Sequence, residues 1–313
     1  MAANYDVLVV GAGPAGLTLA NYLGLMGVRT LVVERNAATV QEPRAVSIDD
    51  ETLRTMQAIG LVDRVLPTIV SGYGARYDTP HRRPFARIAP SAREFGYPRR
   101  SAFRQPVLEA ILRDGLERFD CVELRFGCAL ESFDQDDTGV TAVLRAADGT
   151  GATVRAGWLA ACDGASSTVR SRLGIAMVGS TFEERWLVVD AVDYDNEERD
   201  SVALCDHRRP AITLPGPEGT RRWEFLVKPG ERAEDFLEEA TIRALLADLG
   251  ASPATKIVRR TVYTFHARIA GCWSERRVFL LGDAAHLTPP YAGQGMNSGQ
   301  RDAFNFAWKV AAV

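Results

Sequence analysis

The sequence has 313 residues, 46% hydrophobic and 25% charged, which is ordinary for a globular chain able to bury a core. Its 37 lysines and arginines nearly balance 40 aspartates and glutamates, and a formal net charge of −3 excludes the strong field that nucleic acid or an anionic membrane would need. The five cysteines and four histidines have spacings that suit neither a disulfide framework nor a metal site. No apolar run is long enough to span a bilayer. We therefore expect a cytoplasmic protein with no membrane, nucleic-acid or metal partner.

The chain begins with a predicted strand, a helix and a second strand. Residues 6–10 and 29–33 are short apolar runs of the kind found in buried parallel strands. Between them, residues 14–26 place apolar side chains at helical spacing. Together they form a βαβ unit of normal size.

A glycine-rich turn joins the first strand to the helix, with Gly11, Gly13, Ala15 and Gly16 in the pattern G-x-G-x-x-G. The first glycine allows a tight turn, the second lets the backbone approach a pyrophosphate, and the third permits close packing of helix and strand. Glu34 ends the second strand, where a carboxylate can accept both ribose hydroxyls, and Arg35 follows it. The pattern predicts a dinucleotide site but does not separate FAD from NAD.

Further elements follow in chain order. They are helices at 49–59 and 106–119, alternating strands from about 120 to 160 and from 181 to 265, a helix near 233–249, a strand at 277–283, a loop rich in proline and glycine at 288–299, and a helix from about Gln300.

Two more motifs follow strand-like runs. The first contains Asp163, Gly164 and Arg170, and the second begins with Gly282 and Asp283. A carboxylate at the end of a buried strand, next to small residues, suits a sugar hydroxyl. The glycine-rich loop that comes next can aim backbone N–H groups at the electron-rich edge of a ring. The loop residues singled out here are Pro290, Gly293, Gly295, Met296 and Asn297.

The three motifs, in this order, resemble the flavoprotein aromatic hydroxylases, the single-component class A monooxygenases, over nearly the whole chain. The resemblance implies that residues 162–170 serve both FAD and NAD(P)H and that Asp283 binds the ribityl chain of FAD. It also implies that Arg44 and Gln105 contact FAD. The runs at 48–67, 94–100 and 294–309 look most like the branch that hydroxylates 3-(3-hydroxyphenyl)propionate.

The resemblance implies an α/β fold, with a Rossmann-like FAD-binding domain interrupted by a mostly antiparallel β substrate domain. The first would take residues 1–75, 101–180 and 266–313, and the second 76–100 and 181–265. The implied reaction uses NADH or NADPH, O2 and FAD to hydroxylate a phenolic acid ortho to its hydroxyl group, giving a catechol. Two alternatives stay open: a flavin-dependent dehydrogenase or reductase without oxygen insertion, and an inactive FAD-binding fragment.

The residues leave the catalytic base open. His286 and Asp49 are candidates, but the histidine suits a structural role in its loop and the aspartate suits a helix cap. Tyr97, Arg99 and Arg100 are candidates for the substrate pocket, although solvated charge explains each of them alone.

The last residues carry apolar side chains on more than one face of the predicted helix, including Phe304 and Trp308, and the helix has no cap before Val313. We expect the chain to be the N-terminal part of a longer protein and to expose an apolar patch near Trp308. The sequence leaves open whether the whole protein forms a homo-oligomer.

Overall fold

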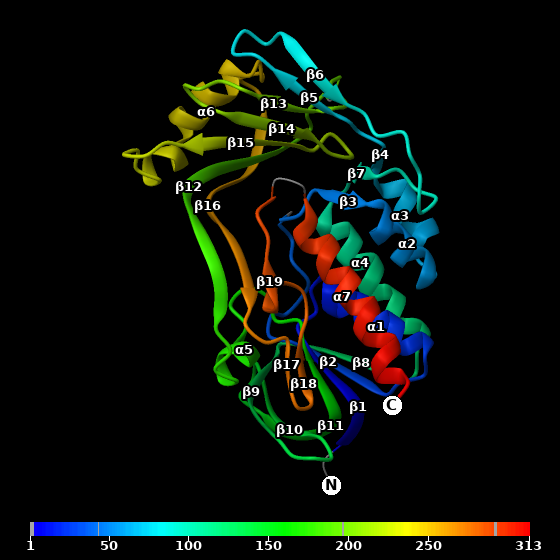
Figure 1. Cartoon of the computed structure of the whole chain (residues 1–313). Helices are drawn as coiled ribbons and strands as arrows, with labels where there is room; N and C mark the ends of the chain where they lie inside the picture. The colour runs from blue at the N-terminus through cyan, green and yellow to red at the C-terminus, as the bar shows by residue number, and fades with distance from the viewer. Residues whose placement is uncertain (1–2, 43, 196, 291–292) are drawn as a thin grey trace.

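The computed structural model describes residues 3–42, 44–195, 197–290 and 293–313. Two large sheets lie one beyond the other along the molecule, and long helices flank the first of them (Figure 1).

The first sheet carries the parallel strands that the sequence predicts. In spatial order they are β18 (Val278–Leu280), β11 (Gly151–Ala161), β1 (Ala3–Val10), β2 (Thr30–Glu34) and β8 (Val122–Phe126). The short β17 (Ser274–Glu275) pairs antiparallel with β18, and the ribbon of β9 (Cys128–Gln135) and β10 (Val140–Ala146) continues antiparallel from β11.

Helices and the ribbon cover opposite faces of this sheet. Alternate residues of β1, such as Val7 and Val9, pack with α1 (Pro14–Leu25), α4 (Gln105–Gly115) and α7 (Gln294–Ala311). Leu8 and Val10 face the ribbon in a second core. Burial on both faces explains why these strands read as continuous apolar runs.

The second sheet is mostly antiparallel. Its order is β19 (His286–Leu287), β16 (Lys256–Ala270), β12 (Met177–Val192), β15 (Arg221–Val227), β14 (Ala211–Pro215), β13 (Ser201–Leu204), β5 (Ala75–Asp78) and β6 (Pro84–Ile88). Strands β12 and β16 are 16 and 15 residues long and run from the first sheet to the far end of the second (Figure 1).

The two faces of the second sheet differ in chemistry. On the outer face, Trp223, Phe225 and Leu187 pack beneath α6 (Glu239–Asp248) in a third core. On the opposite face, here called the inner face, the alternate residues include Arg222, which donates to the backbone carbonyl of Arg44. The inner face is therefore turned toward the segment that joins β2 to β3.

A small three-stranded sheet lies between the two large ones. It has the order β3 (Ser47–Asp49), β7 (Arg100–Ala102) and β4 (Val70–Ser71). The remaining elements are α2 (Asp50–Ala58), α3 (Val62–Val65), α5 (Thr168–Arg172) and 3₁₀ turns at Leu66–Thr68, Leu116–Arg118, Glu234–Leu237 and Gly282–Ala284.

The predicted fold class, an α/β chain with a parallel sheet and a mostly antiparallel one, is confirmed. The last helix corrects the sequence analysis, because α7 begins at Gln294 and not near Gln300. Gly295 and Gly299 were assigned to a loop, but both are helical. The intrinsic helix propensity of glycine is only about 1 kcal/mol less favourable than that of alanine, and tertiary packing overrides this difference.

Candidate cofactor site

Four strand ends bring the sequence motifs to one edge of the first sheet. Because β18, β11, β1 and β2 are parallel neighbours, their carboxyl ends meet there. The last residue of β2 and the turns after the other three strands carry, in order along the edge, Gly282, Asp163, Gly11 and Glu34. Residues from 11 to 283 are thus gathered at the place where open α/β sheets bind their ligands.

The glycines of the first turn meet the demands that the pattern predicts. Gly11 has φ of 104°, and a Cβ there would lie 2.4 Å from the Cys162 carbonyl oxygen. A Cβ on Gly16 would lie 2.0 Å from the Gly11 oxygen, whereas one on Gly13 would meet open space. Ala15 stands between the two tight positions. Gly11 and Gly16 therefore permit packing within the protein, and Gly13 leaves the helix N-terminus open to a ligand.

Glu34 is held at the end of β2 by the neighbouring backbone. One carboxylate oxygen accepts from the Ala12 N–H at 3.0 Å, and the other accepts from the Asn36 backbone at 2.9 Å and its side chain. The carboxylate is half-buried and fixed beside the glycine turn, and Arg35 next to it is exposed.

The second motif is clamped to the third. The Arg170 guanidinium is buried and donates to the carbonyl oxygens of Ala284 at 2.9 Å and Ala165 at 2.8 Å. Asp163 accepts from the Val169 N–H with one oxygen, while its other oxygen is buried without a hydrogen bond to any described residue. Gly164 has φ of 81° and open space where a Cβ would be. Arg170 is thus a structural clamp, and Asp163 retains a free acceptor.

Asp283 presents a carboxylate just after β18, at the same edge of the sheet. The preceding Gly282 has φ of 57° and donates its N–H to Asp302 at 2.9 Å. The Asp283 side chain is open to solvent on one side but surrounded by protein on the others, and this desolvation raises the pKa of its carboxyl. It has no hydrogen bond to the residues that the structure describes, so its acceptors are available to a ligand.

The start of α7 is locked onto β3. The Asn297 amide is fully buried: its oxygen accepts from the Asp49 N–H at 3.3 Å and Thr52 Oγ1 at 2.8 Å, and its nitrogen donates to the carbonyls of Ser47 and Gly293. Asn297 was predicted to contact the cofactor, but its side chain is committed to protein partners. Any contact with a ligand falls to its backbone.

The other residues of this loop are placed as follows. Gly293 is left-handed at φ of 66°, with Ser47 Cβ only 2.8 Å from where its own Cβ would be. Gly295 has room, Met296 packs partly into the first core, and Pro290 is exposed. Residues 291 and 292 lie outside the described residues.

Arg44 and Gln105 meet in a network with a third residue that the sequence analysis missed. Gln105 Oε1 accepts from the N–H groups of Arg44 and Ala45, and its Nε2 donates to Glu109 at 2.7 Å. Glu109 is 1% exposed, and desolvation raises the pKa of its carboxyl despite hydrogen bonds from Gln105 and the Val40 N–H. An acid on the buried face of an amphipathic helix is the sequence signal that could have marked it.

The two candidate catalytic residues both make structural contacts. Asp49 caps α2 by accepting from the Thr52 N–H at 2.8 Å, and its other oxygen pairs with Arg301 at 3.0 Å. His286 lies 2.7 Å from Asp302, the residue that also holds Gly282, and its Nδ1 is buried without a partner among the described residues. Both candidates therefore make contacts that hold neighbouring elements together.

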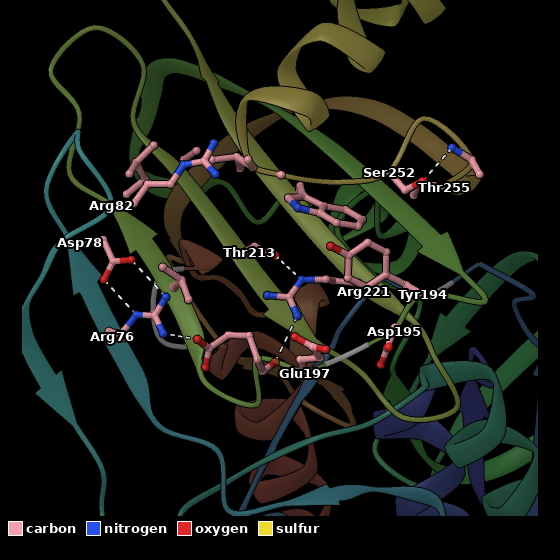
Figure 2. A pocket seen from close by; sticks show the side chains of 18 of the residues that line it. Arg76, Asp78, Arg82, Tyr194, Asp195, Glu197, Thr213, Arg221, Ser252 and Thr255 are labelled. Carbon is pink, nitrogen blue, oxygen red and sulfur yellow. Dashed lines mark hydrogen bonds and ion pairs between the residues drawn. The ribbon is translucent and has the colours of Figure 1, made fainter.

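A separate pocket of about 680 Å³ opens on the outer face of the second sheet (Figure 2). Arg221 crosses it and donates to Thr213 Oγ1 at 2.7 Å, with Tyr194 and Trp223 beside it. Since Trp223 and Arg221 point away from the inner face, this pocket is not the site formed by the three motifs. Among the described residues there is no cluster of acid, histidine and cysteine side chains that could hold a metal, and no helix has the length and apolarity to cross a membrane.

The residues at the sheet edge fit an FAD molecule. An open helix N-terminus at Gly13, a fixed carboxylate at Glu34, and free acceptors on Asp163 and Asp283 match a pyrophosphate and sugar hydroxyls. The family model described as an FAD binding domain matches residues 4–313. The chain belongs to this family. The cofactor predicted from the sequence, FAD, and the recognition of a flavoprotein aromatic hydroxylase family are thereby confirmed.

Curated relatives of this FAD-binding chain are longer than it is. It is 46% identical over 309 residues to the 3-(3-hydroxy-phenyl)propionate/3-hydroxycinnamic acid hydroxylases of Escherichia coli and Shigella sonnei. The match covers 98% of this chain and 56% of each relative, so the chain spans about half of their length.

Solved structures agree with the fold. The p-nitrophenol 4-monooxygenase of Pseudomonas putida superposes with a TM-score of 0.89 at 29% identity, covering 100% of this chain and 80% of that one. Aklavinone-11 hydroxylase, solved with FAD and aklavinone, gives a TM-score of 0.87 at 32% identity, covering 99% of this chain and 62% of that one.

Proposed function

We propose that this FAD-binding chain is the flavin and substrate region of an aromatic-ring monooxygenase. The phenolic acid that it hydroxylates is 3-(3-hydroxyphenyl)propionate, the compound named in the 46%-identical relatives. The single observation that carries the proposal is the convergence of three motifs on one sheet edge, opposite the inner face of the second sheet. In the overall reaction, phenol, O2, NAD(P)H and a proton give catechol, water and NAD(P)⁺.

Each motif has a task in the proposed site. Gly13 and the N-terminus of α1 would hold the pyrophosphate, Glu34 the adenosine ribose, and Asp283 the ribityl chain. Arg44, Gln105, Asp163 and the backbone from Gly293 to Asn297 would complete the contacts. When bound, FAD supplies the electron transfer and the chemistry with O2. The protein's own part is to bind and orient the two ring systems and to exclude water.

We also propose the division into domains. The flavin domain takes residues 1–75, 101–180 and 266–313, and the substrate domain takes 76–100 and 181–265. The sheet memberships support it, since β6 and β13 to β15 lie wholly within the proposed substrate domain and pair within the second sheet. The proposed boundaries at 180 and 266 cut β12 and β16, so the two domains share continuous strands. Five free cysteines suit a cytoplasmic location.

The test is product analysis with the purified chain loaded with FAD. NADH and NADPH are each offered with O2 and a panel of phenolic acids, and catechols are identified by mass spectrometry. A catechol from 3-(3-hydroxyphenyl)propionate supports the proposal. Oxidation of NAD(P)H that yields hydrogen peroxide and no catechol, across the whole panel, would instead assign an electron-transfer flavoprotein.

A further inference from the structure

Arg100 is a cation without an anionic partner at the junction of the sheets. Its guanidinium lies over the Tyr73 ring, with 4.7 Å from Cζ to the ring centroid, and donates to the Tyr73 hydroxyl at 3.2 Å. Its Nε is buried, and among the described residues it has no hydrogen-bond partner and no carboxylate that forms an ion pair with it. A buried donor left without a hydrogen bond, on a cation without an ion pair, is costly and calls for a partner from outside these residues.

Strand register places Arg100 on the same side as the start of α7. In the antiparallel pair of β3 and β7, Asp49 is opposite Arg100 and Ser47 is opposite Ala102, so these side chains share one face. Ile48, on the other face, is buried in the first core. The Arg100 face is the one onto which α7 docks, through Arg301 to Asp49 and through Gly293 against Ser47.

A short chain of contacts links Arg100 to the glycine loop. Arg100 donates to the Tyr73 hydroxyl, and this hydroxyl in turn donates to Ser47 Oγ at 3.0 Å. The Ser47 Cβ lies 2.8 Å from the position that a Gly293 Cβ would take. The cation is therefore two hydrogen bonds away from Ser47, which packs against the loop that the proposed function assigns to FAD.

Neighbouring acids do not supply the missing anion. Asp49 is opposite in register, but its oxygens are occupied by the Thr52 N–H, Gln294 and Arg301. Glu94, the acid nearest in sequence, pairs with Arg99. The adjacent arginines thus differ: Arg99 is an exposed surface ion pair, and Arg100 is half-buried and open to a partner.

We propose that Arg100 binds the carboxylate of the phenolic acid substrate and so selects acids over neutral phenols. The inference rests on the proposed function and adds the group that determines specificity. A guanidinium held in place by an aromatic ring and a hydrogen bond to its hydroxyl group is preorganised to receive a carboxylate through two parallel N–H donors.

The experiment measures dissociation constants for the FAD-loaded protein by isothermal titration calorimetry. The ligands are 3-(3-hydroxyphenyl)propionate and its neutral amide, 3-(3-hydroxyphenyl)propanamide. We expect Arg100→Met to raise the Kd of the acid roughly 10- to 100-fold, the scale of a lost charge-assisted hydrogen bond, and to change that of the amide less than about threefold. Arg100→Lys should fall between, and Arg99→Met, the matched control, should leave both constants unchanged.

The outcomes of this experiment separate a loss of folding, a loss of substrate selection and a failure of the proposed function. FAD occupancy and Tm of Arg100→Met equal to those of the parent show that the fold is intact, and Arg100→Lys provides the same comparison with the charge kept. Equal affinity of parent and Arg100→Met for the acid overturns the inference alone, as does an effect confined to the KM for NAD(P)H. A parent protein that holds FAD but binds no phenolic acid overturns the proposed function together with the inference.

Discussion

The acidic residues at the cofactor edge differ in whether their carboxylates already accept hydrogen bonds from the protein. Glu34 accepts three hydrogen bonds from its neighbours, so its carboxylate is held in place before any ligand arrives. Asp283 accepts none from the described residues and is desolvated. The first is preorganised for binding, and the second keeps its acceptors available for a ligand that donates to it.

Glu34→Gln should weaken FAD binding by roughly 1–3 kcal/mol, because charge-assisted hydrogen bonds to the ribose and to the Ala12 N–H are lost. Fluorescence titration of the apoprotein with FAD measures the change. Glu117→Gln, at an exposed position in the 3₁₀ turn that follows α4, is the control and should bind FAD as the parent does. A Glu34→Gln protein with the parental Kd would remove this residue from the site.

Asp283→Ala should separate cofactor retention from folding. The carboxylate makes no hydrogen bond or ion pair with the described residues, so its removal should leave the Tm of the apoprotein equal or higher. The flavin content of the purified variant should fall well below that of the parent, which absorbance at the flavin band reports. A lower apoprotein Tm with unchanged flavin content would contradict the assignment.

The sequence located the strand-end residues of this edge because their spacing reflects short-range geometry. Gly11, Gly16 and Asp163 follow strands that hydrophobic runs reveal. It could not reveal which side chains are already occupied. Asn297 meets Ser47 and Thr52 across about 250 positions of chain, and Glu109 meets Val40 across 69. Such contacts exist only after the sheets and helices have packed.

Among the elements, α7 departs most from its sequence prediction. Its glycines are helical because the backbone must approach its neighbours: a Cβ on Gly299 would lie 3.1 Å from Gly282 Cα and 3.4 Å from Ala15 Cβ. The N-termini of α1 and α7 and the turn at Gly282 therefore meet at one point. Propensity alone indicates a loop there, and tertiary packing decides for a helix.

Gly299→Ala should lower the free energy of unfolding. Overpacking costs roughly 1–3 kcal/mol, and the gain in helix propensity returns only about 1 kcal/mol. Asn305→Ala, at an exposed position on the same helix, should instead gain a few tenths of a kcal/mol. Urea denaturation of both variants compares them. Equal stabilisation by the two substitutions would show that the close approach at Gly299 is unimportant.

For the molecule as a whole, the outer surface of α1 and α7 is unusually apolar. Leu25, Phe304 and Trp308 are each about half exposed, and the rings of Tyr22 and Phe304, 5.4 Å apart, show that the two helices adjoin. These three residues are here called the α1–α7 patch. Its exposure agrees with the apolar surface near Trp308 that the sequence predicts.

The α1–α7 patch should drive self-association of this chain. Burying one large apolar side chain is worth roughly 1.5–3 kcal/mol, so Trp308→Gln should raise the association midpoint by about tenfold or more in sedimentation velocity across a concentration series. Val258→Gln removes a side chain of similar exposure from β16 and should have no effect. If the parent remains monomeric up to high concentration, the patch is not adhesive.

Strands β12 and β16 have a mechanical consequence. At about 3.3 Å per residue each extends roughly 50 Å, from Met177 against the second core to Ala191 in the third. Their ladder is continuous except for the register shifts between Thr181 and Arg185 and between Asp190 and Ala191. We expect the pair of β12 and β16 to be stiff where its hydrogen bonds are regular and to bend at the two register shifts. We therefore expect the inner face of the second sheet to approach the cofactor edge by bending at Thr181–Arg185. Sliding of one sheet past the other would instead break the hydrogen bonds between β12 and β16.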